Sequence, residues 1–505
     1  MPEYLYPGVY VEEIDTGNKP IEGVSTSTVG FLGLSERGPV EPTPVTSFGE
    51  FVRYFGKYCD VDGAVAYLPY AVEGFFQNGG KRCVISRVTS AGATTASVTL
   101  GGWTLKALGP GDWSGRLYYT VTQRDPLIPV FTLTLICFNT NSPDLVNLNP
   151  RQIQHSEVFE DLAIDPASAN FVERRVNWVS TLVMVDQDTP PTAPSLVSAL
   201  TAMPAGTAVS ALTLADFKGD PAALPGQRIG LVAFEEVEDI SILCCPDEHR
   251  FFPDIANELA AQAAKLRYRF AILQSELTPS GGAITNWKPS AEGSKYAAFY
   301  YPWMNVVDAA TGKVVKIPNG GHVAGIYART DAERGVHKAP ANSMVLGIDS
   351  LTAELNNEQQ GFLNPKGINV IRYFRGSGNL VWGARTVASD PDWKYVNVRR
   401  LFIFIEKSIE RGTQWVVFEP NDEPTWARVR RSVGDFLTRA WMDGMLQGRT
   451  KEEAFFVKCD RTTMTQGDID NGRLICVIGV APVKPAEFVV FRIGQWTGGS
   501  EVTEQ

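Results

Sequence analysis

Three different patterns of apolar and polar residues follow one another along the chain. Over residues 23–89, a short apolar run, an amphipathic stretch closed by glycines and a second apolar run appear as STVGFLGLSERGP, AVAYLPYAVEGFFQNGG and KRCVISRV. Short apolar runs on either side of one helical stretch are typical of a parallel sheet with a crossover helix. We therefore predict the first part of an α/β domain here.

The pattern changes over residues 90–185, where apolar residues alternate with Thr, Ser and other polar residues. ASVTLGGWTLKAL, RLYYTVTQ and PVFTLTLICF each have the two-residue period of a half-buried strand. We predict an inserted β-rich domain over 90–185. Residues 186–228, which are rich in Pro, Ala, Thr and Ser, are predicted to be a linker or a surface excursion.

The α/β pattern returns over residues 229–385. DISILCCPD and FAILQS read as strands on either side of a helix in PDIANELAAQAAKLRYR, so the insertion separates two parts of one α/β domain. Later, SKYAAFYYPWMNV and LNPKGINVIRYF indicate further strands. Between them, we interpret GGHVAGIYARTDAERGVHKAPAN as a glycine-rich loop, with Gly320, Gly321 and Gly325 serving backbone turns.

Residues 386–480 contain two clear amphipathic helices and form a predicted α+β C-terminal domain. In the first helix Gly412 is placed to end the helix, and in the second Pro424 follows an Asn-Asp start. The apolar face of the second helix comprises Trp426, Val429, Val433, Phe436, Leu437 and Ala440. Three arginines fall opposite this face, at Arg428, Arg431 and Arg439. They form either a solvated face or a contact with another protein.

Each end of the chain carries a short segment with the composition of a strand. Gly and Pro separate residues 1–22 and 481–505 from the neighbouring predicted domains, so neither segment can bury itself alone. We therefore predict a strand-forming arm at each end, and an unpaired strand of this kind is a hazard unless another chain pairs with it. The residues expected to pair are Val9, Tyr10, Val11, Ile14, Phe488, Val489, Val490 and Phe491.

Five separated motifs resemble the contractile tail-sheath proteins of phages, tailocins and extracellular injection particles. They are PGVYVEEIDTGNKPIEGVSTSTVGFLG, GHVAGIYARTDAERGVHKAPAN, LNPKGINVIR, WKYVNVRRLFIFIEKSI and FEPNDEPTWARVR, in the family's order. GPGDWSG and NWVSTLV in the insertion match only loosely. The resemblance implies a middle domain with a subtilisin-like fold and arms that complete a sheet in neighbouring subunits.

The same resemblance implies a function and a set of partners. Subunits would form stacked hexameric rings around an inner tube protein, meet baseplate and terminator or cap proteins, and contract from a metastable extended state without ATP. Subunits would assemble in the bacterial cytoplasm. The sheath would then be a component of a phage tail or of a phage-tail-like particle, which can be released from the cell. The resemblance does not decide whether the particle is a phage, a toxin injector or a bacteriocin. It makes the three arginines candidates for contact with the tube or with a neighbouring subunit.

Composition is compatible with this picture. The 505 residues, 44% of them hydrophobic, suffice for several domains, and the formal net charge of -10 disfavours nucleic acid as a partner. No apolar run approaches the roughly 20 residues that cross a bilayer, and the acidic start does not resemble a signal peptide, so we expect a protein without membrane binding. Seven dispersed cysteines favour reduced thiols.

Candidate chemistry is sparse. The four histidines have no zinc-ligand spacing, and no nucleotide-binding glycine motif occurs, so we expect neither a metal nor a cofactor. His322, Asp331 and Ser343 could suggest a serine hydrolase on the middle domain, but no GxSxG sequence surrounds a serine, and we interpret them as structural loop residues. We therefore predict a protein that is not an enzyme. A serine hydrolase and a baseplate component remain the alternatives.

Overall fold

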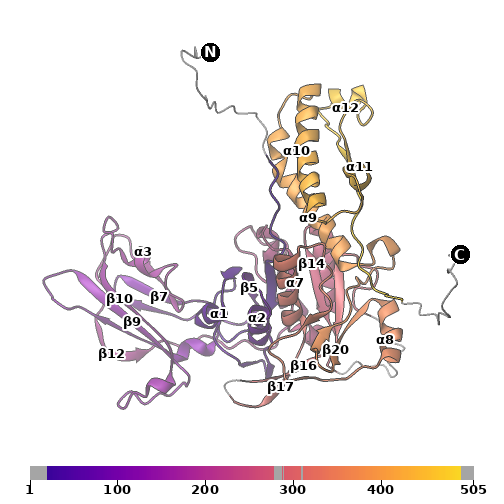
Figure 1. Cartoon of the computed structure of the whole chain (residues 1–505). Coiled ribbons are helices and arrows are strands. Elements are labelled where there is room, and N and C mark those ends of the chain that lie inside the picture. The colour runs from indigo at the N-terminus through magenta and orange to yellow at the C-terminus, as the bar shows by residue number, and fades with distance from the viewer. Residues whose placement is uncertain (1–19, 278–286, 288, 309–310, 491–505) are drawn as a thin grey trace, which may run out of the picture.

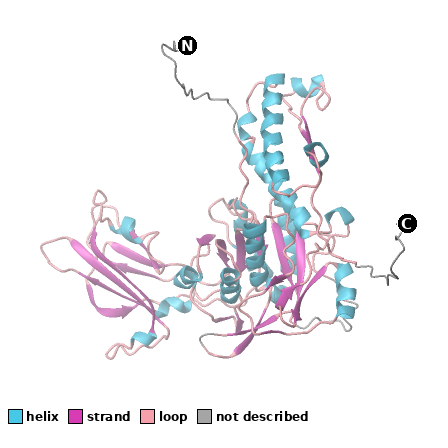
Figure 2. Cartoon of the chain, viewed as in Figure 1, coloured by secondary structure: helices cyan, strands magenta, loops and turns pink. Residues whose placement is uncertain are grey.

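The computed structural model describes residues 20–277, 287, 289–308 and 311–490 (Figure 1). Three separate clusters of buried apolar side chains organise it: one around a large sheet, one in a β-rich unit and one in a helical C-terminal unit. The β-rich and C-terminal units project from the large sheet in different directions (Figure 2). The predicted mixed α/β multidomain fold is therefore confirmed.

A nine-stranded sheet lies at the centre of the chain. Its order is β18-β21-β20-β15-β14-β13-β1-β5-β2, and the six strands from β20 to β5 are parallel. The strands are β1 (Val29–Gly33), β2 (Thr43–Val45), β5 (Cys83–Arg87), β13 (Ile242–Cys244), β14 (Phe270–Gln274), β15 (Ala297–Tyr301), β18 (Ser343–Met344), β20 (Ile368–Phe374) and β21 (Gly378–Val381). Every residue of β1, β5, β13, β14 and β15 is buried, as expected for parallel strands covered on both faces.

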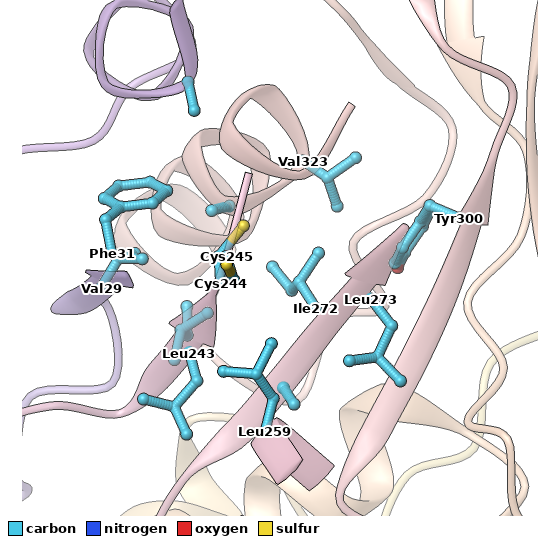
Figure 3. Close-up of a cluster of buried hydrophobic side chains, with 14 of the residues drawn as sticks. Val29, Phe31, Leu243, Cys244, Cys245, Leu259, Ile272, Leu273, Tyr300 and Val323 are labelled. Carbon is cyan, nitrogen blue, oxygen red and sulfur yellow. The ribbon is translucent and has the colours of Figure 1, made fainter. Parts of the chain in front are cut away.

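The sheet joins stretches that are far apart in the chain. β1 lies between β5 and β13, with Val29 opposite both Cys83 and Ile242. Helices α6 (Asp254–Leu266) and α7 (Gly320–Arg334) pack on β13 and β14. In Figure 3, Leu259 of α6 and Val323 of α7 lie on opposite sides of these strands. The sheet is therefore sandwiched between helices.

Helix α7 corrects one interpretation, because residues 320–334 form a helix rather than a glycine-rich loop. Gly321 and Gly325 allow close packing on α2 (Leu68–Gln77) instead of serving turns. A Cβ atom on Gly321 would lie 2.3 Å from the carbonyl oxygen of Ala71, and one on Gly325 would lie 2.5 Å from that of Phe75. Glycine is a poor helix former in isolation, so the tertiary contact decides the structure of this segment.

The β-rich unit consists of two antiparallel sheets around their own core. One has the order β10-β9-β8-β12 and the other β11-β7-β6. The strands are β6 (Ser97–Leu100), β7 (Trp103–Ala107), β8 (Leu117–Thr122), β9 (Val130–Phe138), β10 (Ile153–Ala163), β11 (Val183–Gln187) and β12 (Val197–Ala202). β12 pairs with β8, so part of the stretch predicted to be a linker or a surface excursion completes a sheet of this unit.

A polar network joins the β-rich unit to the central sheet. Glu36, which follows β1, pairs with Arg116 at 2.7 Å and accepts a hydrogen bond from Gln154 at 2.8 Å. Burial works to raise the pKa of Glu36, but the charges of Arg116 and Arg37 hold it below its usual value. Because both partners lie in the β-rich unit, the network fixes that unit against the sheet.

The C-terminal unit is built from α9 (Val396–Gly412), α10 (Glu423–Met442) and a hairpin of β22 (Phe455–Lys458) and β23 (Val477–Val480). All six predicted apolar residues of α10 are buried, and Gly412 is the last residue of α9 as predicted. Asp422 caps α10 by accepting a hydrogen bond from the amide of Thr425 at 3.0 Å, and Pro424 lies in its first turn.

Shorter elements connect these units. They are α1 (Phe48–Phe55), β3 (Asp60–Val61), β4 (Ala64–Val65), α3 (Val172–Val176), α4 (Leu214–Lys218), α5 (Gly230–Ala233), β16 (Met304–Val307), β17 (Val314–Ile317), β19 (Ser350–Leu351), α8 (Asn357–Leu363), α11 (Lys451–Ala454) and α12 (Gln466–Asp470). All seven cysteines are free. None of the helices in the described ranges is long and apolar enough to span a bilayer.

Candidate functional site at the two arm roots

The first described residues, 20–28, run along the C-terminal unit, and we call them the N-terminal root. Ile21 is buried in the core of that unit, where it packs against Gly412. Arg439 donates to the carbonyl oxygen of Ile21 at 2.7 Å, and the amide of Val24 donates to the hydroxyl of Ser408 at 3.1 Å. The N-terminal root is therefore fixed to α9 and α10 of its own chain.

A buried ion pair ties the N-terminal root to the central sheet as well. Arg400 of α9 donates to both carboxylate oxygens of Asp331 of α7, at 2.8 and 2.6 Å, and to the carbonyl oxygen of Thr26 at 2.8 Å. The hydroxyl of Thr26 donates to Asp331 at 2.6 Å. Burial works to lower the pKa of Arg400, but Asp331 holds it above its usual value. One charge pair thus links α7, α9 and the N-terminal root.

The last described residues include a second fixed segment, 481–487, which we call the C-terminal root. Arg385 donates to the two oxygens of Glu487, from Nε at 2.7 Å and from Nη2 at 2.8 Å. The amide of Asn364 and the hydroxyl of Tyr395 also donate to Glu487, at 2.9 and 3.0 Å. This carboxylate therefore fixes the C-terminal root beside the central sheet.

The residues predicted to form strand arms fall largely beyond these roots. Five of them lie outside the described residues, namely Val9, Tyr10, Val11, Ile14 and Phe491. Phe488, Val489 and Val490 are described, belong to no strand, and are 72, 68 and 77% exposed. Pairing of these residues with another chain stays a prediction. The structure adds that Glu487, which the sequence placed within the arm, belongs to its root.

Arg428, Arg431 and Arg439 are exposed on α10, opposite its apolar face. Arg428 pairs with Glu419 at 2.7 Å and lies over the ring of Trp415. Arg439 holds the N-terminal root, a role that its sequence position did not indicate. Contact of this face with a tube or a neighbour stays a prediction.

Helix α7 also bears on the hydrolase alternative. His322 and Asp331 both lie on α7, nine residues or about 13.5 Å apart along the axis, and neither is the loop residue that we expected. The carboxylate of Asp331 accepts from Arg400 and Thr26. Burial lowers the pKa of His322 to about 4, so its ring stays neutral. The three residues do not have the mutual geometry of a triad.

Phe418, in the loop between α9 and α10, was missed by sequence reasoning. Its side chain is 102% exposed, and its backbone has a φ of 68°, which is strained for a bulky residue. Hydrogen bonds on both sides hold the loop, including one from the amide of Glu419 to the carbonyl oxygen of Val416 at 3.0 Å. A positive φ leaves no mark in the sequence when the residue is not glycine, so no pattern could have indicated it.

The described residues contain no group of His, Cys, Asp and Glu side chains that could hold a metal ion. The arrangement at the roots is instead suited to mechanical attachment. Each root is fixed to its own chain by arginines, and the C-terminal root leads directly into exposed apolar residues.

Two family profiles match adjacent stretches of the chain. The phage tail sheath protein central domain matches residues 225–387, and the phage tail sheath C-terminal domain matches residues 388–495. The chain belongs to the phage tail sheath family. The matched residues include every strand of the central sheet that follows residue 225 in the chain, from β13 to β21. They also include all of α9 and α10 and the side chains that hold the two roots.

Individual relatives agree with the family assignment. The tail sheath protein of Burkholderia phage BcepMu is 25% identical over 472 residues, which cover 88% of each chain. The tail sheath protein of Vibrio phage KVP40 is 28% identical over 177 residues. The matched stretch covers 34% of this chain and 26% of the KVP40 protein. The matched stretch thus spans about a quarter of this much longer relative.

Solved sheath structures extend the match to nearly the whole chain. The helical sheath of the anti-feeding prophage in its contracted state has a TM-score of 0.59 and 25% identity, covering 97% of this chain and 99% of that one. The sheath of the extracellular injection system PVC, also contracted, has a TM-score of 0.57 at 22% identity. The predicted membership in the contractile sheath family is confirmed.

Proposed function

We propose that this chain is a structural sheath subunit that polymerises around an inner tube and contracts from a metastable extended state. The observation that carries the proposal is the match of 97% of the chain to a helical sheath in its contracted state. The two roots support it, because they fix the chain at Ile21 and at Glu487, and the apolar residues 488–490 directly after the C-terminal root are exposed.

Strand donation supplies the connections between subunits. An arm that pairs with a neighbour's sheet contributes backbone hydrogen bonds worth on the order of 1 kcal/mol net each. The hairpin of β22 and β23 is a suitable acceptor, because a two-stranded sheet has free edges and is marginally stable alone. Subunit bodies re-pack during contraction while the donated strands stay paired.

The finer features follow from the same proposal. The middle domain has a subtilisin-like fold without a catalytic triad. The protein therefore has a structural and mechanical role and is not an enzyme. Its partners are further copies of itself in stacked hexameric rings, the inner tube protein, and baseplate and terminator or cap proteins. Assembly takes place in the bacterial cytoplasm, and the sheath then forms part of a phage tail or a phage-tail-like particle.

Co-expression with an inner tube protein tests the proposal. Negative-stain electron microscopy should show tube-filled cylinders in a long form and a shorter, wider form. Discrete soluble particles that never form cylinders would contradict a sheath role. A baseplate component is a second candidate, because the chain matches one chain of the anti-feeding prophage baseplate with a TM-score of 0.59. Gold labelling confined to one end of the particle would favour the baseplate.

A further inference from the structure

Glu487 occupies a polar site that is elaborate for a residue near a chain end. Four hydrogen bonds reach its two oxygens, two of them in the bidentate geometry that arginine makes with a carboxylate. Lys394 adds a further charge at 3.6 Å. Such a site specifies both the position and the orientation of the carboxylate.

Contacts other than those with Glu487 also hold Arg385. Its side chain is only 9% exposed, and its Nη1 donates to the carbonyl oxygen of Asn364 at 2.8 Å. The buried amide of Asn369 accepts from the backbone N–H of Arg385 at 2.7 Å. The guanidinium therefore presents a preformed fork, and little side-chain entropy is lost when Glu487 binds it.

The Glu487 site marks a sharp boundary along the chain. Before it, the amide of Asn397 holds the carbonyl oxygen of Val483 at 3.1 Å, and the backbone of Ala481 pairs with that of Ala454. After it, three consecutive apolar side chains are more than two-thirds exposed. The C-terminal root also lines a cavity of about 920 Å³, so packing does not support it on that side. Hydrogen bonds to Met445, Gln447 and Ala454 also hold residues 481–483, and the contacts of Glu487 fix the end of the root beyond them.

We propose that the pair of Glu487 and Arg385 is a clamp that sets where and in which direction the C-terminal arm leaves the subunit. The clamp attaches the start of the arm to Arg385, which is hydrogen-bonded to β20 of the central sheet, although the preceding strand β23 belongs to the C-terminal unit. This inference rests on the proposed strand donation. A fixed exit raises the effective concentration of the arm at its acceptor and lowers the entropy cost of joining two subunits.

The carboxylate of Glu487 stays charged near neutral pH. Burial works to raise the pKa of Glu487, but the hydrogen bonds from Arg385 and Asn364 lower it to about 2. Acid therefore does not release the arm until the pH falls well below 4.5. Substitution is the direct way to open the clamp.

The test compares Glu487→Gln and Glu487→Ala with Glu423→Gln, which removes a charge from an exposed pair with Arg461 at 3.4 Å. Three quantities are measured: the melting temperature of unassembled protein, its cleavage by chymotrypsin after Phe488, and the fraction that sediments as cylinders. The Glu487 variants should stay folded but melt at a lower temperature, because Arg385 loses its carboxylate partner. They should also be cut about tenfold faster and lose most of the cylinders, because charge-assisted hydrogen bonds are lost. Glu423→Gln should match wild type in all three.

Deletion of residues 489–505 separates the clamp from the function on which it rests. If the deletion blocks assembly while Glu487→Ala forms normal cylinders with normal cleavage, the clamp is wrong and strand donation stands. If the deletion itself forms normal cylinders, strand donation by this arm is wrong. A Glu487→Gln protein that loses its folded signal would also overturn the proposal, since the residue would then serve the fold.

Discussion

Replacing Asp331 with alanine should destabilise the protein strongly, because it leaves the guanidinium of Arg400 buried without its carboxylate. The side chains of Arg400 and Asp331 are only 4 and 5% exposed, and two charge-assisted hydrogen bonds join them. Removing one partner of a buried ion pair costs about 3–5 kcal/mol. The hydroxyl of Thr26 loses its acceptor as well, so the N-terminal root should loosen.

Urea unfolding of unassembled protein, followed by both circular dichroism and tryptophan fluorescence, measures this cost. Glu423→Ala is the matched control, because its pair with Arg461 is 73 and 66% exposed and should contribute less than about 1 kcal/mol. The double variant Asp331→Ala with Arg400→Met should recover part of the loss, since no buried charge then remains unpaired. The reasoning would be refuted if Asp331→Ala lowered the free energy of unfolding by less than about 1 kcal/mol. It would also be refuted if the double variant were less stable than both Asp331→Ala and Arg400→Met alone.

Other predictions concern assembly and pH. Reversing Arg428 and Arg431 to glutamate, with Arg439 left in place because it holds the N-terminal root, should leave the circular dichroism spectrum intact but impair cylinder formation around the tube; normal tube-filled cylinders would exclude this face as the contact. Replacing residues 91–209 with a short linker should preserve polymerisation, since Ser90 and Ser210 are hydrogen-bonded neighbours at 3.2 Å; recovery of monomers alone would count against it. Burial lowers the pKa of His322 from 6.5 to about 4 in the folded state. Protonation therefore favours the unfolded chain, and the free energy of unfolding falls as the pH is lowered from about 6.5 towards 4. His322→Gln should therefore flatten the fall in urea midpoint between about pH 7.5 and about pH 5, and an unchanged fall would exclude this cause.

Periodic elements of the fold were predictable, and tertiary exceptions were not. Helix α10 follows from its apolar stripe, its Asp422 cap and Pro424, all of which are local signals. Helix α7 has three glycines that suit a loop by propensity. The neighbouring α2 explains Gly321 and Gly325, and the side chains of Gln274 and Cys244 in the central sheet explain Gly320. Strand β12 lies in a Pro- and Thr-rich stretch and is fixed by pairing with β8.

The candidate site divides in the same way. The apolar arm residues Phe488–Val490 stand out by their spacing from the preceding prolines, but they belong to no strand, and their pairing with another chain stays a prediction. The contact between Arg400 and Asp331 joins residues 69 positions apart, and that between Arg385 and Glu487 joins residues 102 positions apart. One sequence offers no signal for such pairs, since surface and buried charges look alike until the chain is folded.

The most direct test of the central claim is electron microscopy of the wild-type protein beside a variant that lacks residues 1–20, with circular dichroism of both samples. The account predicts cylinders from the wild type and folded, unassembled subunits from the variant, because the deletion removes the N-terminal arm and leaves Ile21 and the buried core in place. Normal contractile cylinders formed without the arm would contradict strand donation. Loss of the folded signal would show instead that residues 1–20 belong to the core of their own subunit.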